Sequence, residues 1–340
     1  MKQFLAVLLL LMLPIWPAAA EYPTEEMHWP SLVNRAERGE AIAQFSVGYA
    51  ALHGEGEQDP ETALSWLERS AKQGYAPALL KMAELYASGS RVAQDRDKAA
   101  DWYRQAAEQQ VMAAQFSLAE LLWHHQPNSQ QKEEAQRCYR QAATQGVVAA
   151  MLRLAALLGQ EDDAANSASE SEQWYRKAAQ AGSAEAKLAL GYRYYNGYGS
   201  KKDLRTALDW YRQAAEAGHE EAQLQLAYMC YNGYGMPKND RMALHWFTQA
   251  AEQGNSEAQL NLAGLYLRGQ GTAINHFEAY VWFNLAATGE EVSELTKRAQ
   301  AGRTQAARYL SREQQFEAQQ SAGKRYFKQQ RFGHSNMGRE

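Results

Sequence analysis

Two kinds of side chain in this sequence are reactive enough to serve at a chemical site. They are the adjacent histidines His124 and His125 and the cysteines Cys138 and Cys230. Imidazoles bind transition metals, and a thiolate is both a metal ligand and a nucleophile. Neighbouring residues on a helix point about 100° apart, so two adjacent histidines do not chelate one ion together. With no carboxylate or cysteine at ligand spacing from them, we expect no metal site.

Glycine-rich turns are the next candidates, because a glycine-rich loop that opens a helix after a strand binds phosphate. NGYG recurs at 196–199 and 232–235, with HGEG at 53–56 and RGQG at 268–271. These turns recur at one place in a repeating pattern and join helices, so we interpret them as structural: glycine adopts the positive φ that ends a helix. Nothing indicates a Ser-His-Asp arrangement either. The sequence therefore predicts no enzyme and no cofactor.

The elements that position these residues come from a 36-residue period marked by tryptophan. Steps of 36 residues from Trp210 lead to Trp66, Trp102, Cys138, Trp174, Trp246 and Trp282, in a chain with only nine tryptophans. Such an array grows by stacking, so the 340 residues do not divide into two ordinary domains. Seven repeats are predicted, at roughly 41–75, 76–111, 112–147, 148–183, 184–219, 220–255 and 256–291.

Each repeat carries the pattern of two short amphipathic helices. In repeat 5 the first helix places Ala186, Leu190 and Gly191 on one face, where the small residues let two helix backbones approach. The second helix contains Trp210 and ends at Gly218. The cysteines stand where other repeats carry aromatic residues, which indicates buried, unpaired thiols.

The ends of the chain do not follow the repeat. Lys2, a short apolar run and three alanines form the pattern of a secretory signal peptide, with cleavage expected after Ala20. This pattern predicts a periplasmic or secreted protein. The other terminal segments are interpreted as a leader and N-terminal half-repeat at 21–40, capping helices at 292–330 and a disordered tail at 331–340. The last capping helix is predicted to open at Ser311 with a capping box and to end near Lys328.

Charge is distributed unevenly along the chain. The net charge is −4, yet the stretch from Lys297 to Glu340 holds ten Lys or Arg and three acidic residues. Such a basic end favours an anionic partner, such as a membrane surface or an acidic polymer. The alternative is a solvated helical surface followed by a loose tail.

One motif recurs over residues 41–291 and is almost complete in repeat 5. It consists of Ala186, Leu190, Gly191, Tyr194, Gly197, Gly199, Asp203, Ala207, Trp210, Tyr211, Ala214, Ala215 and Gly218. The motif resembles the Sel-one-like repeat, a relative of the tetratricopeptide repeat. The resemblance implies an all-α fold: a right-handed α-α superhelix of about seven helix-turn-helix repeats with capping helices, which binds proteins or peptides. Cysteine-rich relatives linked to β-lactams carry a cysteine pair in every repeat, which this chain lacks.

The resemblance also implies a binding surface. In tetratricopeptide-like helices, residues one before and two, six and nine after the first-helix alanine face the concave side. Carried over to this chain, that rule places aromatic side chains on the inner wall: Phe116, Trp123, Tyr192, Tyr195, Tyr228 and Tyr231. Large, stiff side chains with a polar tip suit a peptide groove. The alternative is that they pack between repeats or against the glycine turns.

These features favour a periplasmic or secreted, non-catalytic scaffold or adaptor in envelope assembly, signalling or host interaction. Its expected partner is a protein or peptide, with no nucleic acid, metal or cofactor. Two alternatives stay open at this point: a cell-wall or β-lactam hydrolase, and an accessory protein that binds an anionic envelope surface through its basic C-terminal end.

Overall fold

The computed structural model describes residues 29–53, 60–125, 127–160, 166–198, 201–288 and 293–336. Within these ranges the chain forms seventeen helices and no strand, so the expected all-α repeat fold is confirmed. The expected signal peptide and residues 21–28 of the leader lie outside the described residues. The chain divides into two compact units, whose described parts are residues 29–157 and 158–336.

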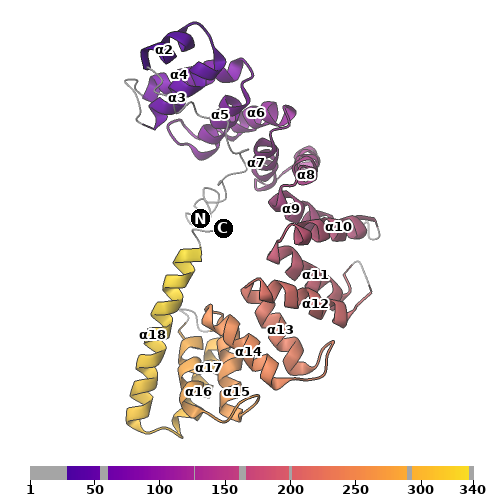
Figure 1. Ribbon diagram of the computed structural model, residues 1–340, viewed down its shortest axis with the longest axis vertical. Coiled ribbons are helices and arrows are strands. Elements are labelled where there is room, and N and C mark those ends of the chain that lie inside the picture. Colours follow the sequence, from indigo (N-terminus) through magenta and orange to yellow (C-terminus); the bar gives the residue numbers. More distant parts are fainter. Residues whose placement is uncertain are drawn as a thin grey trace. The chain divides into compact units, whose positions relative to one another are not determined.

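The N-terminal unit is a succession of antiparallel helix pairs, shown in indigo to magenta in Figure 1. Consecutive helices between residues 29 and 144 pack against one another. Its helices are α2 (Trp29–Glu37), α3 (Ala41–Leu52), α4 (Pro60–Lys72), α5 (Ala76–Ser88), α6 (Arg96–Glu108), α7 (Met112–Trp123), α8 (Ser129–Thr144) and α9 (Val148–Leu158), the last of which ends at the unit boundary.

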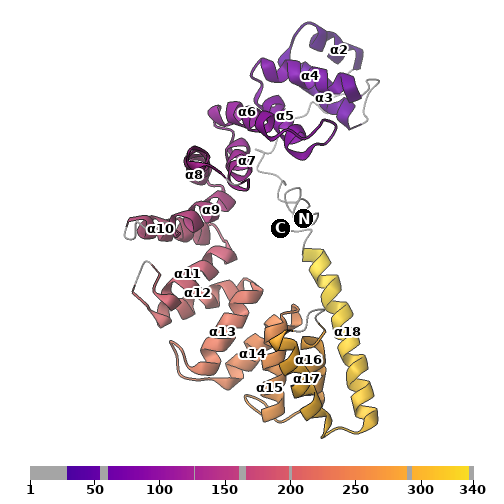
Figure 2. The same ribbon diagram turned by 180° about the vertical axis from the view of Figure 1, so that it is seen from behind.

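The C-terminal unit continues the same alternation of first and second helices, as the reverse view in Figure 2 shows. Its helices are α10 (Asn166–Gln180), α11 (Ala184–Asn196), α12 (Leu204–Glu216), α13 (Glu220–Asn232), α14 (Asp240–Glu252), α15 (Ser256–Arg268), α16 (His276–Ala286), α17 (Glu294–Ala307) and α18 (Arg312–Asn336).

Local sequence accounts for the helix boundaries. Gly197 takes the left-handed conformation (φ +82°) that ends α11, and its amide hydrogen-bonds to the carbonyl of Arg193. Asp203 then caps α12, because its carboxylate accepts hydrogen bonds from the amides of Arg205 and Thr206. The following two repeats use Gly233 and Gly269 with the N-caps Asn239 and Asn275.

The core lies between the helices of each pair, and only some of the tryptophans that mark the period belong to it: Trp66, Trp174 and Trp282 are buried. Trp210 is only half-buried, whereas Tyr211 is fully buried; Phe247 is its equivalent in repeat 6. One residue along a helix turns the side chain by about 100°, which carries Tyr211 into the interior. Helices α11 and α12 pack too closely here for a larger residue, since a Cβ on Gly191 would stand 2.5 Å from the Tyr211 ring.

Helix α2 occupies the place of a second helix that precedes repeat 1. The side-chain amide of Gln44 on α3 donates to the carbonyl of Ala36 on α2 at 3.0 Å. The same bond links first and second helices within the array, in the pairs Gln115 to Ala107, Gln223 to Ala215 and Gln259 to Ala251. The N-terminal cap therefore reproduces an internal contact of the repeats.

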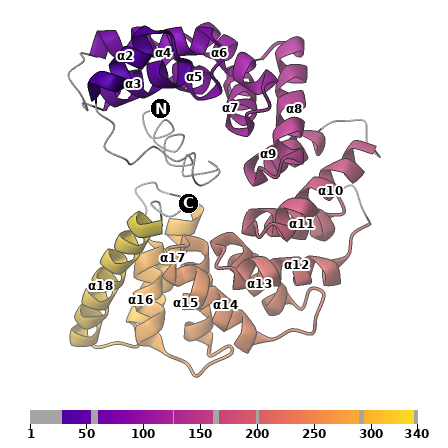
Figure 3. The same ribbon diagram turned by 45° about the horizontal axis from the view of Figure 1, so that its top comes forward.

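The C-terminal cap consists of α17 and α18, and Figure 3 shows α18 lying alongside α16. Ser311 and Gln314 form the predicted capping box. The predicted end of this helix is wrong: α18 runs through residues 331–336, expected to be disordered, to Asn336. The good helix formers at 328–331 carry it past Lys328. Residues 337–340 lie outside the described part.

Two contacts anchor α18 on the last two repeats. The Arg325 guanidinium donates two hydrogen bonds of 2.9 Å to the carboxylate of Glu278 on α16. Further along, the amide of Gln329 donates to the carbonyl of Ala251 at 2.8 Å. The long helix therefore covers the final repeat through specific polar contacts as well as through buried alanines.

Candidate functional site

The four tyrosines predicted to form a binding wall lie in one compact unit, on α11 and α13. All four are half-buried. We call the surface made by side chains of α11, α13, α15 and α17 the first-helix wall. The other two predicted residues, Phe116 and Trp123, are also half-buried, but they lie on α7 in the N-terminal unit.

The hydroxyls of two wall tyrosines are used between repeats. Tyr192 donates to the carboxylate of Glu221 at 2.7 Å, and Tyr228 donates to that of Glu257 at 2.6 Å. Burial raises the pKa of both phenols, and the adjacent carboxylates raise the pKa further. Both rings therefore stay neutral and link each repeat to the next.

Their rings pack edge-on against the buried aromatic residue of the same repeat. The ring centroids of Tyr192 and Tyr211 lie 5.6 Å apart, and those of Tyr228 and Phe247 lie 5.3 Å apart. These two tyrosines thus have a structural role in addition to any contact with a ligand.

The other two wall tyrosines each carry a lysine over the ring. The ammonium of Lys202 lies 5.3 Å from the Tyr195 ring, and that of Lys238 lies 5.0 Å from the Tyr231 ring. No hydrogen bond between these hydroxyls and a carboxylate occurs in the described part of the chain. Tyr195 also faces the Tyr211 ring, at a centroid distance of 6.5 Å, and the Tyr231 hydroxyl donates to the amide oxygen of Gln270 at 3.4 Å. These contacts are longer than those of Tyr192 and Tyr228, so we expect substitution of Tyr195 and Tyr231 to disturb the stack least.

A single rule of contact repeats along the first helices. We call the sixth residue after the first-helix alanine the wall position, and the third residue after the alanine of the next repeat the facing position. The two side chains meet in four pairs of successive repeats. The recorded pairs are Tyr49 with Lys81, Glu120 with Arg153, Tyr192 with Gln225 and Tyr228 with Asn261.

In the N-terminal unit the rule brings opposite charges together. Glu120, a buried wall residue, accepts hydrogen bonds from Arg153 at 3.1 Å and from the Tyr139 hydroxyl at 2.6 Å. Its second oxygen lies 3.1 Å from the Nε2 atom of His124. The expectation that no carboxylate stands within reach of the histidines is therefore wrong: Glu120 lies one helical turn away.

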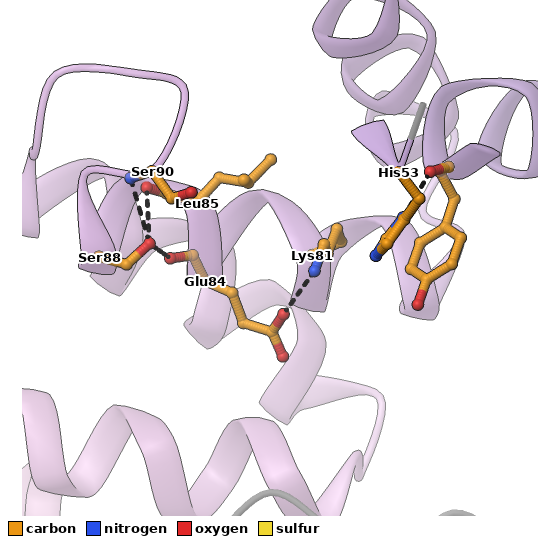
Figure 4. A network of polar contacts seen from close by, with 7 residues as sticks. His53, Lys81, Glu84, Leu85, Ser88 and Ser90 are labelled. Carbon is orange, nitrogen blue, oxygen red and sulfur yellow. Dashed lines mark hydrogen bonds and ion pairs between the residues drawn. The ribbon is translucent and has the colours of Figure 1, made fainter. Parts of the chain in front are cut away.

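Repeats 1 and 2 show the same rule with lysine in the facing position. The Lys81 ammonium lies 5.6 Å from the centre of the Tyr49 ring and 3.3 Å from the Glu84 carboxylate. Figure 4 shows this ion pair, together with the bond of Ser88 to the backbone carbonyl of Glu84. A cation in the facing position is thus matched by a ring or a carboxylate.

Repeat 7 departs from the rule, because its wall position is Gly264. An open hollow of about 560 Å³ lies there, between α15 and α17, with Phe283 of α16 among the residues that line it. The lining includes the guanidinium-bearing residues Arg268 and Arg298, the amides Asn261 and Gln305, and Tyr231. No Asp or Glu is among the residues that line this hollow.

Both arginines of the hollow are exposed. The nitrogens of Arg268 would lie 3.0–3.1 Å from a Cβ on Gly264, so its guanidinium covers the missing side chain. Arg268 Nε donates to the amide oxygen of Gln270 at 2.6 Å. Neither arginine makes an ion pair within the described residues.

The described residues give little support for a nucleophilic cysteine, a metal site or a membrane-spanning helix. Burial raises the pKa of Cys138 and of Cys230 to about 11, which is the opposite of what a nucleophilic cysteine needs. No group of three or more His, Cys, Asp or Glu is placed to hold a metal ion in this part of the chain. Among the described helices, none combines the length and the apolar character that spanning a bilayer requires.

Three residues of the hollow were not predicted from the sequence. Gly264 and Arg268 were detectable, since they replace Tyr and Asn at the same positions of repeats 5 and 6. Arg298 lies beyond the last repeat, so the period does not place it. Its position follows only from the way α17 packs on α15 and α16.

Comparison with known proteins supports the repeat fold. No curated protein matches the chain. A solved structure of a protective antigen from uropathogenic Escherichia coli, described as displaying an SLR fold, is 28% identical, with a TM-score of 0.67 over 92% of this chain and 66% of that one. This chain thus spans about two thirds of that relative. A Sel1 repeat protein from Oxalobacter formigenes is 24% identical, with a TM-score of 0.70 over 88% of each chain.

The family model described as the Sel1 repeat matches the chain seven times, which confirms the expected resemblance. The matched residues are 41–75, 76–111, 113–147, 148–183, 184–219, 220–255 and 256–290. These matches extend over most of the chain and coincide with the helix pairs of the structure. The protein therefore belongs to the Sel1 repeat family.

Proposed function

We propose that this protein is an exported, non-catalytic scaffold that binds a peptide segment of a partner protein along the first-helix wall of repeats 5 to 7. Sel1 repeat proteins are generally protein-interaction scaffolds, and the family is generally non-catalytic. To this general role the proposal adds a binding surface, the first-helix wall, and a location outside the cytoplasm.

One observation carries the choice of surface. Half-buried aromatic side chains recur in register on α11 and α13, and this row leads to the open hollow beside Gly264. Aromatic anchors next to a concave pocket are typical of protein-binding hot spots. The amides of Asn261 and Gln305 both donate and accept hydrogen bonds, as a peptide backbone requires.

Export is supported by the first twenty residues, whose charge, apolar run and alanines have the order of a signal peptide. The similar protein from uropathogenic Escherichia coli is described as a protective antigen, a description that suits a protein reached by antibodies. The buried thiols argue against a cysteine nucleophile, since neither Cys138 nor Cys230 has the depressed pKa that such a nucleophile needs.

The test replaces the two wall tyrosines whose hydroxyls make no bond to a carboxylate. The double variant Tyr195→Ala with Tyr231→Ala is expected to weaken partner capture from an envelope extract by about tenfold or more. Tyr192 and Tyr228 are unsuitable, because each combines a contact with a core ring and a short hydrogen bond to a carboxylate of the next repeat. Quantitative mass spectrometry of proteins retained by the tagged protein measures the effect.

A matched control removes two exposed tyrosines that lie off the wall. Tyr198 and Tyr309 are 64% and 63% exposed, and their double alanine variant is expected to retain the full partner set. An unchanged partner list for the wall variant, or an equal loss for the control, contradicts the proposed surface.

A second candidate function, attachment to an anionic membrane surface, is favoured by the outer face of α18. Phe316 and Phe327 are 60% and 70% exposed there, on a helix that also carries the exposed Lys324. Exposed aromatic residues together with lysines suit a lipid interface. Part of the basic charge is used internally, since Arg325 pairs with Glu278 and Arg303 bonds to Asn284.

Flotation with phosphatidylglycerol vesicles tests this candidate. The variant Phe316→Ser with Phe327→Ser is expected to lose vesicle binding that the unchanged protein shows at low salt. The binding is expected to fall as salt screens charges over about 10 Å near 0.1 M. Binding that survives the double substitution, or that ignores salt, contradicts it.

A further inference from the structure

The contact rule of the first helices shows which group this fold places beside a cation in the facing position. Arg153 bonds to the carboxylate of Glu120, and Lys81 lies over the ring of Tyr49. In both cases the preceding repeat supplies the matching group from its wall position. The array thus contains an arginine site already filled by a carboxylate.

At the C-terminal end of the first-helix wall an arginine is present, but the wall position of the preceding repeat offers it neither an aromatic ring nor a carboxylate. Helix α17 packs on both α15 and α16, and its Arg298 is among the residues that line the hollow. The wall position opposite is Gly264, which has no side chain to offer. Arg268 reaches over the same glycine and adds a second guanidinium.

The acidic residue of α15 is already bonded, and Glu294, one helical turn before Arg298 on α17, is not among the residues that line the hollow. Glu257 lies on the same helix as Gly264, but its carboxylate accepts the hydrogen bond of the Tyr228 hydroxyl at 2.6 Å. It is absent from the lining of the hollow. The two arginines therefore form a local positive site on a chain whose net charge is −4.

We propose that this hollow, lined by Arg268 and Arg298, binds carboxylate side chains of an acidic segment in the partner protein. One carboxylate takes the place beside Arg298 that Glu120 holds beside Arg153. The inference rests on the proposed function, because it names the chemistry of the peptide that the wall receives.

The remaining lining specifies what surrounds the acidic residues. Leu260, Leu267 and Phe283 supply apolar surface, while Asn261 and Gln305 supply amides for the peptide backbone. A volume of about 560 Å³ falls within the range of ligand pockets and accommodates more than one side chain. The preferred segment is thus acidic with adjacent apolar residues, and paired guanidinium groups recognise its carboxylates with specific geometry.

A phage-displayed library of random peptides of about twelve residues tests this proposal, because selection from random sequences requires no identified partner. The library is selected in parallel on the full mature protein and on the double variant Arg268→Gln with Arg298→Gln. The control is Arg205→Gln with Arg241→Gln, which removes the same charge from exposed positions on α12 and α14.

A second variant closes the hollow without changing its charge. Gly264→Tyr restores the wall tyrosine of the preceding repeats. Only the flexible guanidinium of Arg268 lies within 3.4 Å of the added Cβ, so the variant is expected to fold. Circular dichroism and thermal melting confirm folding for every protein used.

The proposal predicts that the unchanged protein and the control enrich peptides with Asp or Glu beside apolar residues. The arginine variant loses this preference. The best peptide, synthesised with a fluorescent label, is expected to bind the arginine variant about tenfold more weakly. A version of this peptide with Asn and Gln in place of Asp and Glu is expected to bind the unchanged protein with the same loss of affinity. The Gly264→Tyr variant is expected to bind both peptides more weakly.

The other outcomes overturn the proposal and separate it from the proposed function. Peptides enriched without acidic residues, and bound less well by the Tyr195→Ala, Tyr231→Ala variant, leave the wall as the binding face but reject its charge preference. No enrichment on any protein rejects the acidic-peptide site, while the capture experiment decides independently on the wall. Arginine-dependent binding to phosphatidylglycerol vesicles in place of peptides assigns the hollow to lipid.

Discussion

At the scale of single residues, one position of the repeat shows that the surroundings of a buried hydroxyl group determine its contribution to stability. Tyr139 and Tyr211 occupy equivalent places in repeats 3 and 5, and both are fully buried. Tyr139 donates to Glu120 at 2.6 Å, whereas the hydroxyl of Tyr211 is buried with no hydrogen-bond partner. The same side chain is therefore satisfied in one repeat and unsatisfied in another.

Removing the two hydroxyls is expected to have opposite effects on stability. Tyr211→Phe should raise the free energy of unfolding by roughly 1 kcal/mol, because a buried unpaired polar group is lost. Tyr139→Phe should lower it by roughly 1–3 kcal/mol, because the Glu120 carboxylate loses a donor. Urea unfolding of both variants measures the difference. Equal effects of the same sign would show that the two hydroxyls have similar surroundings.

The thiols give a second prediction at this scale. With the pKa of Cys138 and Cys230 raised to about 11, only roughly 0.1% of each is thiolate at about pH 8. Iodoacetamide is therefore expected to modify neither residue in the folded protein and both in urea. Because the folded-state pKa is raised, this term favours folding below the ordinary thiol pKa and is lost as the pH approaches 11. Rapid alkylation of folded protein near pH 8, followed by mass spectrometry, would refute the burial.

At the scale of helices, the sequence predicted most of the architecture and only part of the site. The tryptophan period located the repeats, and Gly197, Gly233 and Gly269 end their first helices as expected. The partners of the tyrosine hydroxyls depend on how neighbouring repeats stack, which no single repeat encodes. The hollow also needs α17, whose sequence lies outside the period, so Arg298 emerged only from the packing.

Two helical glycines test the close approach of first and second helices. Gly191→Ala is expected to cost roughly 1–3 kcal/mol, because the new Cβ meets the Tyr211 ring at 2.5 Å. Gly323 on α18 has no atom within 4 Å of an added Cβ, so Gly323→Ala should gain up to about 1 kcal/mol from helix propensity. Thermal melting compares them, and a neutral Gly191→Ala would contradict the tight pairing of α11 and α12.

At the scale of the whole molecule, each end of the array is closed by a helix that uses contacts found inside it. Helix α2 receives the glutamine bond at Ala36, and α18 returns through Gln329 to the carbonyl of Ala251. Such caps cover the faces that terminal repeats of a linear array would otherwise expose.

The proposed export gives a prediction for the intact chain in its cell. Expression in a Gram-negative bacterium should yield a mature protein that begins at Glu21 and is released by osmotic shock. Intact-mass measurement of the released fraction detects this cleavage. A protein that retains residues 1–20 and stays with the cytoplasmic fraction would contradict export.

Photo-crosslinking in living cells tests the central claim most directly, because it reports which helix face touches a partner. The photoreactive residue p-benzoylphenylalanine is placed at Tyr231 on the wall, or at the exposed Arg241 on the second helix α14. The account predicts a discrete protein adduct from Tyr231 and none of comparable yield from Arg241. Adducts that form at Arg241 and not at Tyr231 would show that partners bind the second helices, and the first-helix wall would not be the binding face.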